Sequence, residues 1–470
     1  MKRRIKNGWL FTGIFFGLFS FVLAAVPVAC RGAEVADRAP IISSTVRVGL
    51  VQQTAQVEFS VAGDEQLISA SKKIVASAGP GERWQVKWNK GQLDLFKNSQ
   101  LTGTFAAGPL QVRENLSYVA VLAGSGELVD WKSGKETVIV GADEKEIFSK
   151  GDLSNFNVLS AQRQGSLRPA KEPNLITLYT ENGSQRYRGT LEFRADEKGL
   201  TVINELPIEE YLSGVVPAEM PATWPAQALK AQAVAARSYV LAQLGTDRKG
   251  GFDVLATQDS QVYKGYAWEN PATNKAVEET RGEVLTFRGL PVEAYFHSSS
   301  GGFTENSEDV WKYSLDYIRA KVDPNDRNNT YYNWQVSYTQ KQLIDQLNCK
   351  GYQFREIGDL NEQERTSTGA RVKRLAIKGL NKEGVSVVEE VYNADQVRLA
   401  LGLKSAFFTM EKEFDRQQKL VKITFRGNGW GHGLGMSQYG ALTLARQGYS
   451  YQDILQYYYS GVTIAKNYGG

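Results

Sequence analysis

Histidine and cysteine are both scarce in this chain of 470 residues, which contains two of each. Cys30 lies near the N-terminus and Cys349 stands alone in the rest of the chain. This nearly excludes a structural disulfide and a cysteine-rich zinc site. His297 and His432 are 135 residues apart and would need a carboxylate or thiolate partner to hold zinc. We therefore expect no metal, no cofactor and a core stabilised by packing alone.

An excess of charge is also absent from most of the chain. The first 29 residues hold four basic side chains and no acidic one, so 51 Lys and Arg balance 51 Asp and Glu in the rest. A neutral chain offers no electrostatic reason to bind nucleic acid, and we expect no such partner.

The N-terminal segment, residues 1–30, is typical of a signal peptide or membrane anchor. Four positive charges in Met1–Lys6 precede an apolar run of 18 residues from Trp9 to Val26. This arrangement directs export, and the run is also long enough for an uncleaved anchor. Cys30 adds a weak lipidation signal. We expect an exported protein of the periplasm or cell envelope that touches the membrane only through this segment.

The remaining sequence predicts an α+β fold with two domains. Residues 41–160 contain period-two runs such as Thr45–Leu50 and Val57–Val61, which predict a β-rich N-terminal domain. A polar stretch with two prolines at 160–173 indicates a domain boundary. Residues 174–465 mix strand and helix patterns and predict a mixed α/β domain, in which 312–420 is a candidate second lobe.

Turn and proline signals predict the first elements of this second domain. Leu175–Thr180 and Tyr187–Arg194 predict a β-hairpin around Asn182-Gly183, a pair that suits a type I′ turn. Pro207 then predicts the start of a short helix that ends before Pro217.

Three further helices are expected from periodicity and capping residues. Residues 225–244 carry one apolar stripe and are followed by Gly245, which suits the position after a helix. A second helix is expected from Ser437 to Gly448. A third follows the capping pair Ser450 and Asp453.

Both histidines lie in loops that are dense in glycine and hydroxyl groups. His297 lies within Tyr295–Gly302 and His432 within Gly427–Ala441. Glycine lets the backbone approach a ligand closely and adopt positive φ, and such loops commonly carry binding or catalytic groups. Either loop alone would fit an ordinary tight turn. The two together, with Ser, Gln, Tyr and Trp interleaved, favour a functional site.

Glu219 is the candidate catalytic acid. It lies between Pro217 and Pro221, which restrict its backbone, and its apolar neighbours Val216 and Met220 would raise its pKa. The N-terminal dipole of the following helix would lower that pKa instead. An exposed loop glutamate without a catalytic role is the plain alternative.

Two other segments offer polar groups to a substrate. Arg237 lies about 18 Å along the 225–244 helix from its start, where it could bind substrate or form a structural ion pair. Asp259–Gly265 combines polar side chains with Tyr263. That combination is typical of sugar sites, in which aromatic faces stack and polar groups bind hydroxyls.

Three segments resemble the stage II sporulation protein D and amidase-enhancer (SpoIID/LytB) family. They are Val215–Tyr239, Phe296–Gly302 and Gly429–Ala441. The motifs are long and ordered along the chain, and the similarity covers roughly residues 175–465. The resemblance implies a lytic transglycosylase that acts on bacterial peptidoglycan in a groove between the lobes of its catalytic domain.

The resemblance also implies roles for individual residues. Glu219 matches the family's catalytic glutamate. The positions that fall in motifs lining the family's glycan groove are Arg237, Tyr239, Asp259, Gln261, Tyr263, His297, Ser298, Ser300, His432, Ser437, Gln438 and Tyr439. Some family members hold a structural zinc through Cys and His ligands, but these motifs contain no Cys here, and no metal is carried over.

The implied chemistry needs one carboxyl group. Glu219 would protonate the glycosidic oxygen between N-acetylmuramic acid and N-acetylglucosamine, and would then take the proton of the muramic C6 hydroxyl as it closes a 1,6-anhydro ring. Two alternatives stay open. One is a noncatalytic cell-wall module that enhances an N-acetylmuramoyl-L-alanine amidase. The other is a hydrolase in which Asp259 or Glu305 lies close to Glu219.

Overall fold

The computed structural model describes residues 45–106, 108–114, 174–246, 250–311, 313–327, 329–466 and 468, with the strand backbones at 119–122, 128–131, 137–140 and 146–149. All of them belong to one unit, Ile42–Gly470. The predicted signal or anchor segment, with Cys30, and the predicted boundary at 160–173 lie outside the described residues. Within the described part, no helix combines the length and the hydrophobicity needed to cross a membrane.

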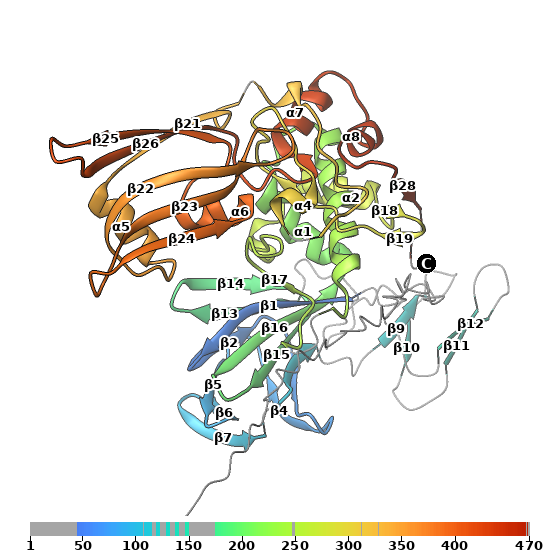
Figure 1. The fold of residues 1–470 in the computed structure, drawn as a ribbon. Helices are drawn as coiled ribbons and strands as arrows, with labels where there is room; N and C mark the ends of the chain where they lie inside the picture. The colour runs from blue at the N-terminus through green and yellow to red at the C-terminus, as the bar shows by residue number, and fades with distance from the viewer. Residues whose placement is uncertain are drawn as a thin grey trace, which may run out of the picture. The chain divides into compact units, whose positions relative to one another are not determined.

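Two β-sheets form around the first strands of the chain (Figure 1). The seven-stranded sheet has the order β17 (Val254–Leu255), β1 (Thr45–Thr54), β16 (Leu200–Pro207), β15 (Thr190–Ala195), β8 (Leu110–Glu114), β3 (Glu65–Ile68) and β4 (Ile74–Ala78). The six-stranded sheet has the order β14 (Gly183–Tyr187), β13 (Ile176–Thr180), β2 (Gln56–Val61), β5 (Arg83–Asn89), β6 (Gln92–Lys97) and β7 (Gln100–Phe105). Alternate residues of β2, namely Val57, Phe59 and Val61, enter a core to which both sheets contribute, as period-two patterning predicts.

Strands from both sides of the predicted boundary share these sheets. β1 pairs antiparallel with β16, and β2 pairs antiparallel with β13. Between them in sequence, β9 (Val119–Leu122) pairs with β10 (Leu128–Trp131), and β11 (Thr137–Val140) pairs with β12 (Glu146–Ser149). The strands that follow residue 174 therefore complete the first two sheets and do not begin a separate sheet.

The predicted hairpin forms, but its second strand, β14, lies earlier in the chain than predicted. β13 pairs with β14, and Thr180 lies opposite Gly183, so the turn residues are Glu181 and Asn182. The predicted second strand, Tyr187–Arg194, is wrong as the partner of β13, because the chain leaves this sheet after Tyr187 and β15 joins the other sheet. Gly189 allows this change of sheet, since it adopts a φ of 71° and a Cβ there would collide with the backbone of Glu205.

Helix α2 (Ala226–Gln243) confirms the strongest helical prediction, and Gly245 follows its end with a φ of 70°. The expected single apolar stripe is wrong, because every residue from Ala228 to Val240 except Lys230 is buried. α2 packs against α1 (Ile208–Glu219), α3 (Pro271–Glu279), α7 (Gln438–Arg446) and α8 (Tyr451–Tyr458) (Figure 1). The many alanines of α2 allow neighbours to pack closely on all of its sides.

The predicted C-terminal helices also form. Ser437 caps α7 by accepting a hydrogen bond from the Gly440 N–H, and Ser450 and Asp453 form the capping box of α8. Shorter elements surround them: η1 (Tyr266–Trp268), β18 (Val284–Phe287), β19 (Leu290–Pro291), β20 (Phe296–His297), α4 (Ser307–Val310), η2 (Pro324–Asp326), β27 (Met436–Ser437) and β28 (Thr463–Ala465).

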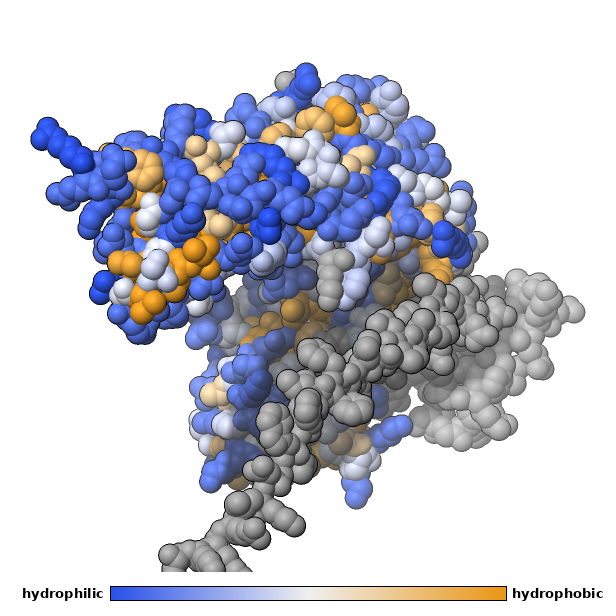
Figure 2. Space-filling view, in the orientation of Figure 1, coloured by the Kyte–Doolittle hydropathy of each residue, from blue (hydrophilic) through white to orange (hydrophobic). Residues whose placement is uncertain are grey.

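Two three-stranded antiparallel sheets occupy most of the region around 312–420, which the sequence pattern left unassigned. One has the order β21 (Asn333–Thr339), β26 (Leu420–Asn428) and β25 (Phe408–Phe414), and the other β22 (Phe354–Arg365), β23 (Val372–Asn381) and β24 (Ser386–Tyr392). Helices α5 (Gln340–Asn348) and α6 (Ala394–Leu401) pack on them. Figure 2 shows a largely hydrophilic surface here, with hydrophobic side chains gathered near the end of the β22-β23-β24 sheet, where Val385 and Val388 are exposed.

Candidate active site

Glu219 is the last residue of α1, so the prediction that this helix ends before Pro217 is wrong. Pro217 lies in the last turn of α1, where it lacks the N–H that would bond to the carbonyl oxygen four residues earlier and restricts the backbone just before the helix ends. The Met220 N–H donates to the Val216 carbonyl oxygen and closes that turn. Met220 itself is extended, as expected for a residue that precedes a proline. Pro221 thus ends the helix at Glu219 and fixes where the carboxyl group projects.

Glu219 is partly exposed, and its carboxyl group accepts two hydrogen bonds. The Val262 N–H donates to Oε1 at 2.8 Å, and Gln438 Nε2 donates to Oε2 at 3.5 Å. Burial raises the pKa of Glu219 above its ordinary value, against the lowering effect of these two donors. A helix C-terminus disfavours negative charge as well. Glu219 therefore combines access to solvent with a preference for the protonated form.

The loop that carries Val262 is anchored by its neighbours. Gln261 is buried, accepts a hydrogen bond from the Tyr211 hydroxyl at 3.1 Å, and donates to the Ala236 carbonyl oxygen at 3.3 Å. The buried Tyr263 hydroxyl donates to Asn204 Oδ1 at 2.9 Å. Gln261 and Tyr263 were predicted to bind substrate. Their side chains are occupied inside the protein and hold the Val262 N–H against Glu219.

Asp259 lies in the same loop but does not join the Glu219 cluster. Its side chain is exposed and accepts a hydrogen bond from the Thr257 hydroxyl at 2.9 Å. It stays available to a ligand at the surface.

Gln438 brings the second histidine loop to Glu219. It is the first residue of α7 and is buried, and its Nε2 also lies 3.4 Å from Gln232 Oε1 on α2. Three helices therefore meet at the carboxyl group. The resemblance marked Gln438 as a site residue, whereas its direct contact with Glu219, 219 positions away, could not be read from local sequence.

The two histidine loops lie side by side. β20 pairs parallel with β27, so His297 is opposite Ser437, and Ser299 forms a bridge with Trp430. A Cβ at Gly301 would lie 2.7 Å from the Asn428 backbone, and one at Gly429 would lie 2.7 Å from the Ser299 carbonyl oxygen. The sequence associated these glycines with close approach to a ligand. At these two positions they allow the loops to approach each other.

Both histidines are packed inside this junction as neutral rings. His297 Nδ1 lies 3.0 Å from the Leu434 carbonyl oxygen, and His432 Nδ1 accepts a hydrogen bond from the Leu434 N–H at 2.9 Å. The ring centres are 5.5 Å apart. Burial lowers the pKa of His297 well below its usual range and that of His432 to about 4. His297 is 4% exposed, so the predicted direct contact with substrate does not fit its position, while His432 is partly exposed.

Two buried aspartates that the sequence analysis missed tie the loops together. Asp326 accepts hydrogen bonds from the Ser299 hydroxyl at 2.6 Å, the Gly301 N–H at 2.7 Å and the Ser437 hydroxyl at 2.8 Å. Asp323 accepts hydrogen bonds from the hydroxyls of Ser300 and Tyr458, each at 3.0 Å. Both aspartates lie at the short helix η2, whose Asp-Pro-Asn-Asp sequence was the available signal.

Ser300 and Ser437 were both predicted to bind substrate. Both are fully buried, and their hydroxyls donate to Asp323 and Asp326 and so hold the two loops together. Ser298 keeps part of its surface exposed, and its carbonyl oxygen accepts a hydrogen bond from the Tyr439 N–H at 3.1 Å. Burial, together with the charge of Asp326, raises the pKa of Asp323 to about 6.

A row of partly exposed aromatic rings leads away from the Glu219 site. The Tyr439 ring lies 5.1 Å from that of Trp224 and 5.5 Å from that of Tyr331, which in turn lies 4.6 Å from that of Trp430. Trp430 is 39% exposed, and Lys404 Nζ lies 4.8 Å from the centre of its ring. Such rings offer flat apolar faces together with polar edges. Tyr331 and Lys404 lie outside the sequence motifs and were not predicted.

Arg237 has a structural role in place of the predicted contact with substrate. It is 2% exposed and forms a two-pronged ion pair with Glu209 of α1, at 2.8 and 2.7 Å. Its other donors reach the carbonyl oxygens of Glu283 and Val277, each at 3.2 Å. Tyr239, two positions after Arg237 and also predicted to bind substrate, is buried as well, with its ring 5.6 Å from that of Tyr295.

Glu305 is likewise occupied. It forms a buried ion pair with Arg371 at 3.0 Å and accepts hydrogen bonds from the Thr366 and Thr368 hydroxyls. It is therefore held inside the protein and has no contact with Glu219 among the described residues.

Comparison with known proteins identifies two families along the chain. The SpoIID family, described as Stage II sporulation protein, matches residues 196–287, which include Glu219 and the Val262 loop. A Domain of unknown function (DUF8618) matches residues 306–435, which include both aspartates of η2 and the two three-stranded sheets.

Individual relatives extend this similarity. Stage II sporulation protein D of Bacillus subtilis (strain 168) is 34% identical over 279 residues, which cover 56% of this chain and 76% of the relative. The protein of the same name from Bacillus amyloliquefaciens is 34% identical over 280 residues, with the same coverage. The amidase enhancer of Bacillus subtilis (strain 168) is 35% identical over 300 residues, which cover 54% of this chain and 40% of that relative. On this similarity, the chain belongs to the stage II sporulation protein D (SpoIID/LytB) family.

Proposed function

We propose that this protein is an exported lytic transglycosylase that cuts the glycan strands of peptidoglycan, with Glu219 as its acid and base. The observation that carries the proposal is the Glu219 carboxyl group. Glu219 is partly exposed, the pKa of this group is raised, and the group is joined through Gln438 to the loop that presents the aromatic row. Aromatic faces beside a protonated carboxyl group suit a polysaccharide that must be held and protonated.

The reaction divides into an acid step and a base step. Protonated Glu219 donates its proton to the glycosidic oxygen between N-acetylmuramic acid and N-acetylglucosamine, and the C1–O bond breaks as an oxocarbenium-like state forms. The C6 hydroxyl oxygen of the same muramic residue then bonds to C1, and its proton passes to the Glu219 carboxylate. The Val262 N–H and the Gln438 amide stabilise that carboxylate between the steps.

The surroundings of Glu219 favour this route over hydrolysis. A hydrolytic glycosidase usually needs a second carboxylate to act as nucleophile or to activate water. The two carboxylates considered for that role are engaged elsewhere, since Asp259 accepts a hydrogen bond from Thr257 and Glu305 is paired with Arg371. An internal sugar hydroxyl removes the need for the second group.

The test is product analysis on purified peptidoglycan by mass spectrometry. The native protein should release muropeptides that end in 1,6-anhydro-muramic acid, and Glu219→Gln should release none while still binding glycan. Glu197→Gln, the same change in the exposed loop between β15 and β16, should retain the product. Full activity of Glu219→Gln would reject the assignment, and reducing ends without an anhydro ring would indicate hydrolysis.

A second candidate function is supported by one relative, the protein named amidase enhancer. In that case the protein would bind the cell wall and stimulate an amidase without cutting glycan itself. It predicts no anhydro product from the protein alone and faster release of stem peptides when a cell-wall amidase is added. Glu219→Gln should then stimulate the amidase as well as the native protein does.

A further inference from the structure

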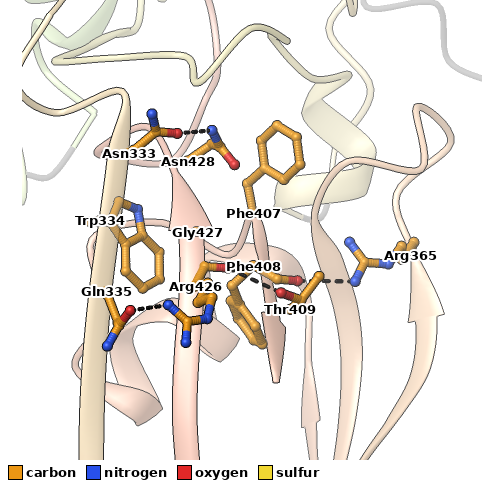
Figure 3. A pocket seen from close by; sticks show the side chains of 10 residues that line it. All are labelled: Asn333, Trp334, Gln335, Arg365, Phe407, Phe408, Thr409, Arg426, Gly427 and Asn428. Atoms are coloured by element: carbon orange, nitrogen blue, oxygen red, sulfur yellow. Dashed lines mark hydrogen bonds between the residues drawn. The ribbon is translucent and has the colours of Figure 1, made fainter. Parts of the chain in front are cut away.

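A pocket with a volume of about 450 Å³ opens beside the β21-β26-β25 sheet (Figure 3). Figure 3 shows the strand of Asn333, Trp334 and Gln335 on one side and Arg365 on the opposite side, with the Phe407 ring between them. The volume lies in the range of sites for small ligands.

The polar groups of the pocket suit an uncharged ligand with amide groups. Asn428 Nδ2 donates to Asn333 Oδ1 at 2.8 Å. In the described part of the chain, this leaves the Asn333 amide hydrogens and the Asn428 amide oxygen without a protein partner. They form a neighbouring donor and acceptor that match the carbonyl oxygen and the N–H of an acetamido group.

The two arginines of the pocket are already neutralised. Arg365 pairs with Glu362 through two hydrogen bonds, at 2.7 and 2.6 Å, and also donates to the Ala370 and Phe408 carbonyl oxygens. Arg426 pairs with Glu411 and donates to Gln335. An acidic ligand would have to compete with these carboxylates, whereas a neutral sugar would not. The partly exposed Phe407 ring supplies an apolar face for a sugar ring.

The pocket and the Trp430 end of the aromatic row are formed by the same three chain segments, residues 331–335, 404–409 and 426–430. Lys404 Nζ lies 4.8 Å from the Trp430 ring centre and 5.7 Å from that of Tyr331. The Gly431 N–H donates to the Lys404 carbonyl oxygen and the Asn428 N–H to that of Phe407, both at 2.8 Å. Phe407 lies three positions after Lys404, a separation of at most roughly 10 Å along the chain. Because the lining residue Asn428 lies two positions before Trp430, the pocket begins close to the end of the aromatic row.

We propose that the pocket is a remote subsite for an N-acetylated sugar of the same glycan strand that is cut at Glu219. The strand would lie across the aromatic row, with one acetamido group bound by Asn333 and Asn428 and the ring stacked on Phe407. This inference rests on the proposed function for the identity of the glycan. It adds that the β21-β26-β25 sheet selects long strands over short ones.

Binding measured by calorimetry tests the subsite without relying on cleavage. The probes are soluble N-acetylglucosamine oligomers, one too short to span the aromatic row and one long enough to reach the pocket, added to the full chain that carries Glu219→Gln. Adding Asn333→Ala, a change at an exposed side chain, should weaken binding of the long oligomer about fivefold and that of the short one by less than twofold. Phe407→Ala should act in the same way.

Glu413→Ala is the matched control, since Glu413 is exposed at the other end of the same sheet. It should change neither affinity. Equal affinities of Asn333→Ala and its parent for the long oligomer, or equal losses for both oligomers, would overturn the subsite. Release of anhydro-muropeptides by the otherwise native protein reports on the proposed function separately, so the failure of one idea can be told from the failure of the other.

Discussion

At the scale of single residues, the identity of the acid was easier to predict than its surroundings. Pro217 and Pro221 mark Glu219 as a constrained glutamate, and the resemblance gave it a catalytic role. Its hydrogen-bond donors come from positions 43 and 219 residues away in sequence. One of them is the backbone N–H of Val262, which every residue type except proline possesses. No local pattern could have identified it.

Gln438→Ala should change the pH dependence of the proposed reaction in a defined direction. The Gln438 hydrogen bond favours the charged carboxylate and so lowers the pKa of Glu219 against the raising effect of burial. Without it, that pKa should rise, and the high-pH fall of kcat/KM, where the acid loses its proton, should move to higher pH. The plateau should drop about tenfold, the effect of losing one hydrogen bond to a charged group.

The measurement is a pH–rate profile of anhydro product release. Gln417→Ala, at an exposed turn position, is the control and should match the native profile. A high-pH fall that shifts to lower pH in Gln438→Ala would contradict this account of the Glu219 environment.

Asp323→Asn should make stability less sensitive to pH. A folded-state pKa of about 6, against an ordinary 3.8, means that the folded protein holds this proton more tightly than the unfolded chain. The associated stability is complete below about pH 3.8 and is lost as pH rises through 6. Roughly two pKa units correspond to about 3 kcal/mol.

Urea unfolding of the native protein and of Asp323→Asn at pH 4 and pH 7 provides the measurement. The difference in unfolding free energy between them should move by about 2.4 kcal/mol in favour of the variant from pH 4 to pH 7. His432 also makes stability depend on pH in this range, with the opposite sign. Both proteins contain His432, so its contribution cancels when the two are compared. A difference independent of pH would show that Asp323 does not hold its proton in the folded state.

At the scale of elements, helices with local capping signals were predictable and strands with distant partners were not. The helices at 226–243, 438–446 and 451–458 all lie within the predicted segments, since capping residues and periodicity act over a few positions. β26 pairs with β21, whose residues lie some 83 to 95 positions earlier. Such pairing depends on the whole fold, which is why the region 312–420 stayed unassigned.

Arg237→Ala should reduce stability strongly, because Arg237 joins α2 to α1. The substitution removes the arginine partner of the Glu209 carboxylate and the Arg237 donor of the Glu283 carbonyl oxygen. Breaking a buried ion pair costs about 3–5 kcal/mol. Urea unfolding would measure the loss. Arg281→Ala removes an exposed pair with Glu278 and should cost at most about 1 kcal/mol. Equal stability of the Arg237 variant and the native protein would return Arg237 to the list of candidate substrate contacts.

At the scale of the whole molecule, the α+β class was predictable from composition and patterning, whereas the connection between the two halves was not. β1 lies between β17 and β16, and β2 lies between β13 and β5. Val46 and Phe59 share a buried cluster with Phe193, Val202 and Val240, which lie beyond the predicted boundary. A polar, proline-containing stretch indicates a linker, but a linker can join two strands of one sheet just as it can join two domains.

A fragment of residues 174–466 should therefore fail to fold by itself. Without β1 and β2, strands β16 and β13 lose hydrogen-bonded neighbours, and apolar side chains such as Phe193 and Val202 become exposed. Unpaired apolar strand edges promote aggregation. A fragment of residues 42–466 keeps both sheets and is the control. Size-exclusion chromatography and thermal unfolding should give a soluble, cooperatively unfolding species for the longer fragment alone. Cooperative unfolding of 174–466 would show that the first two strands are dispensable and that the sequence-based boundary separates two independent domains.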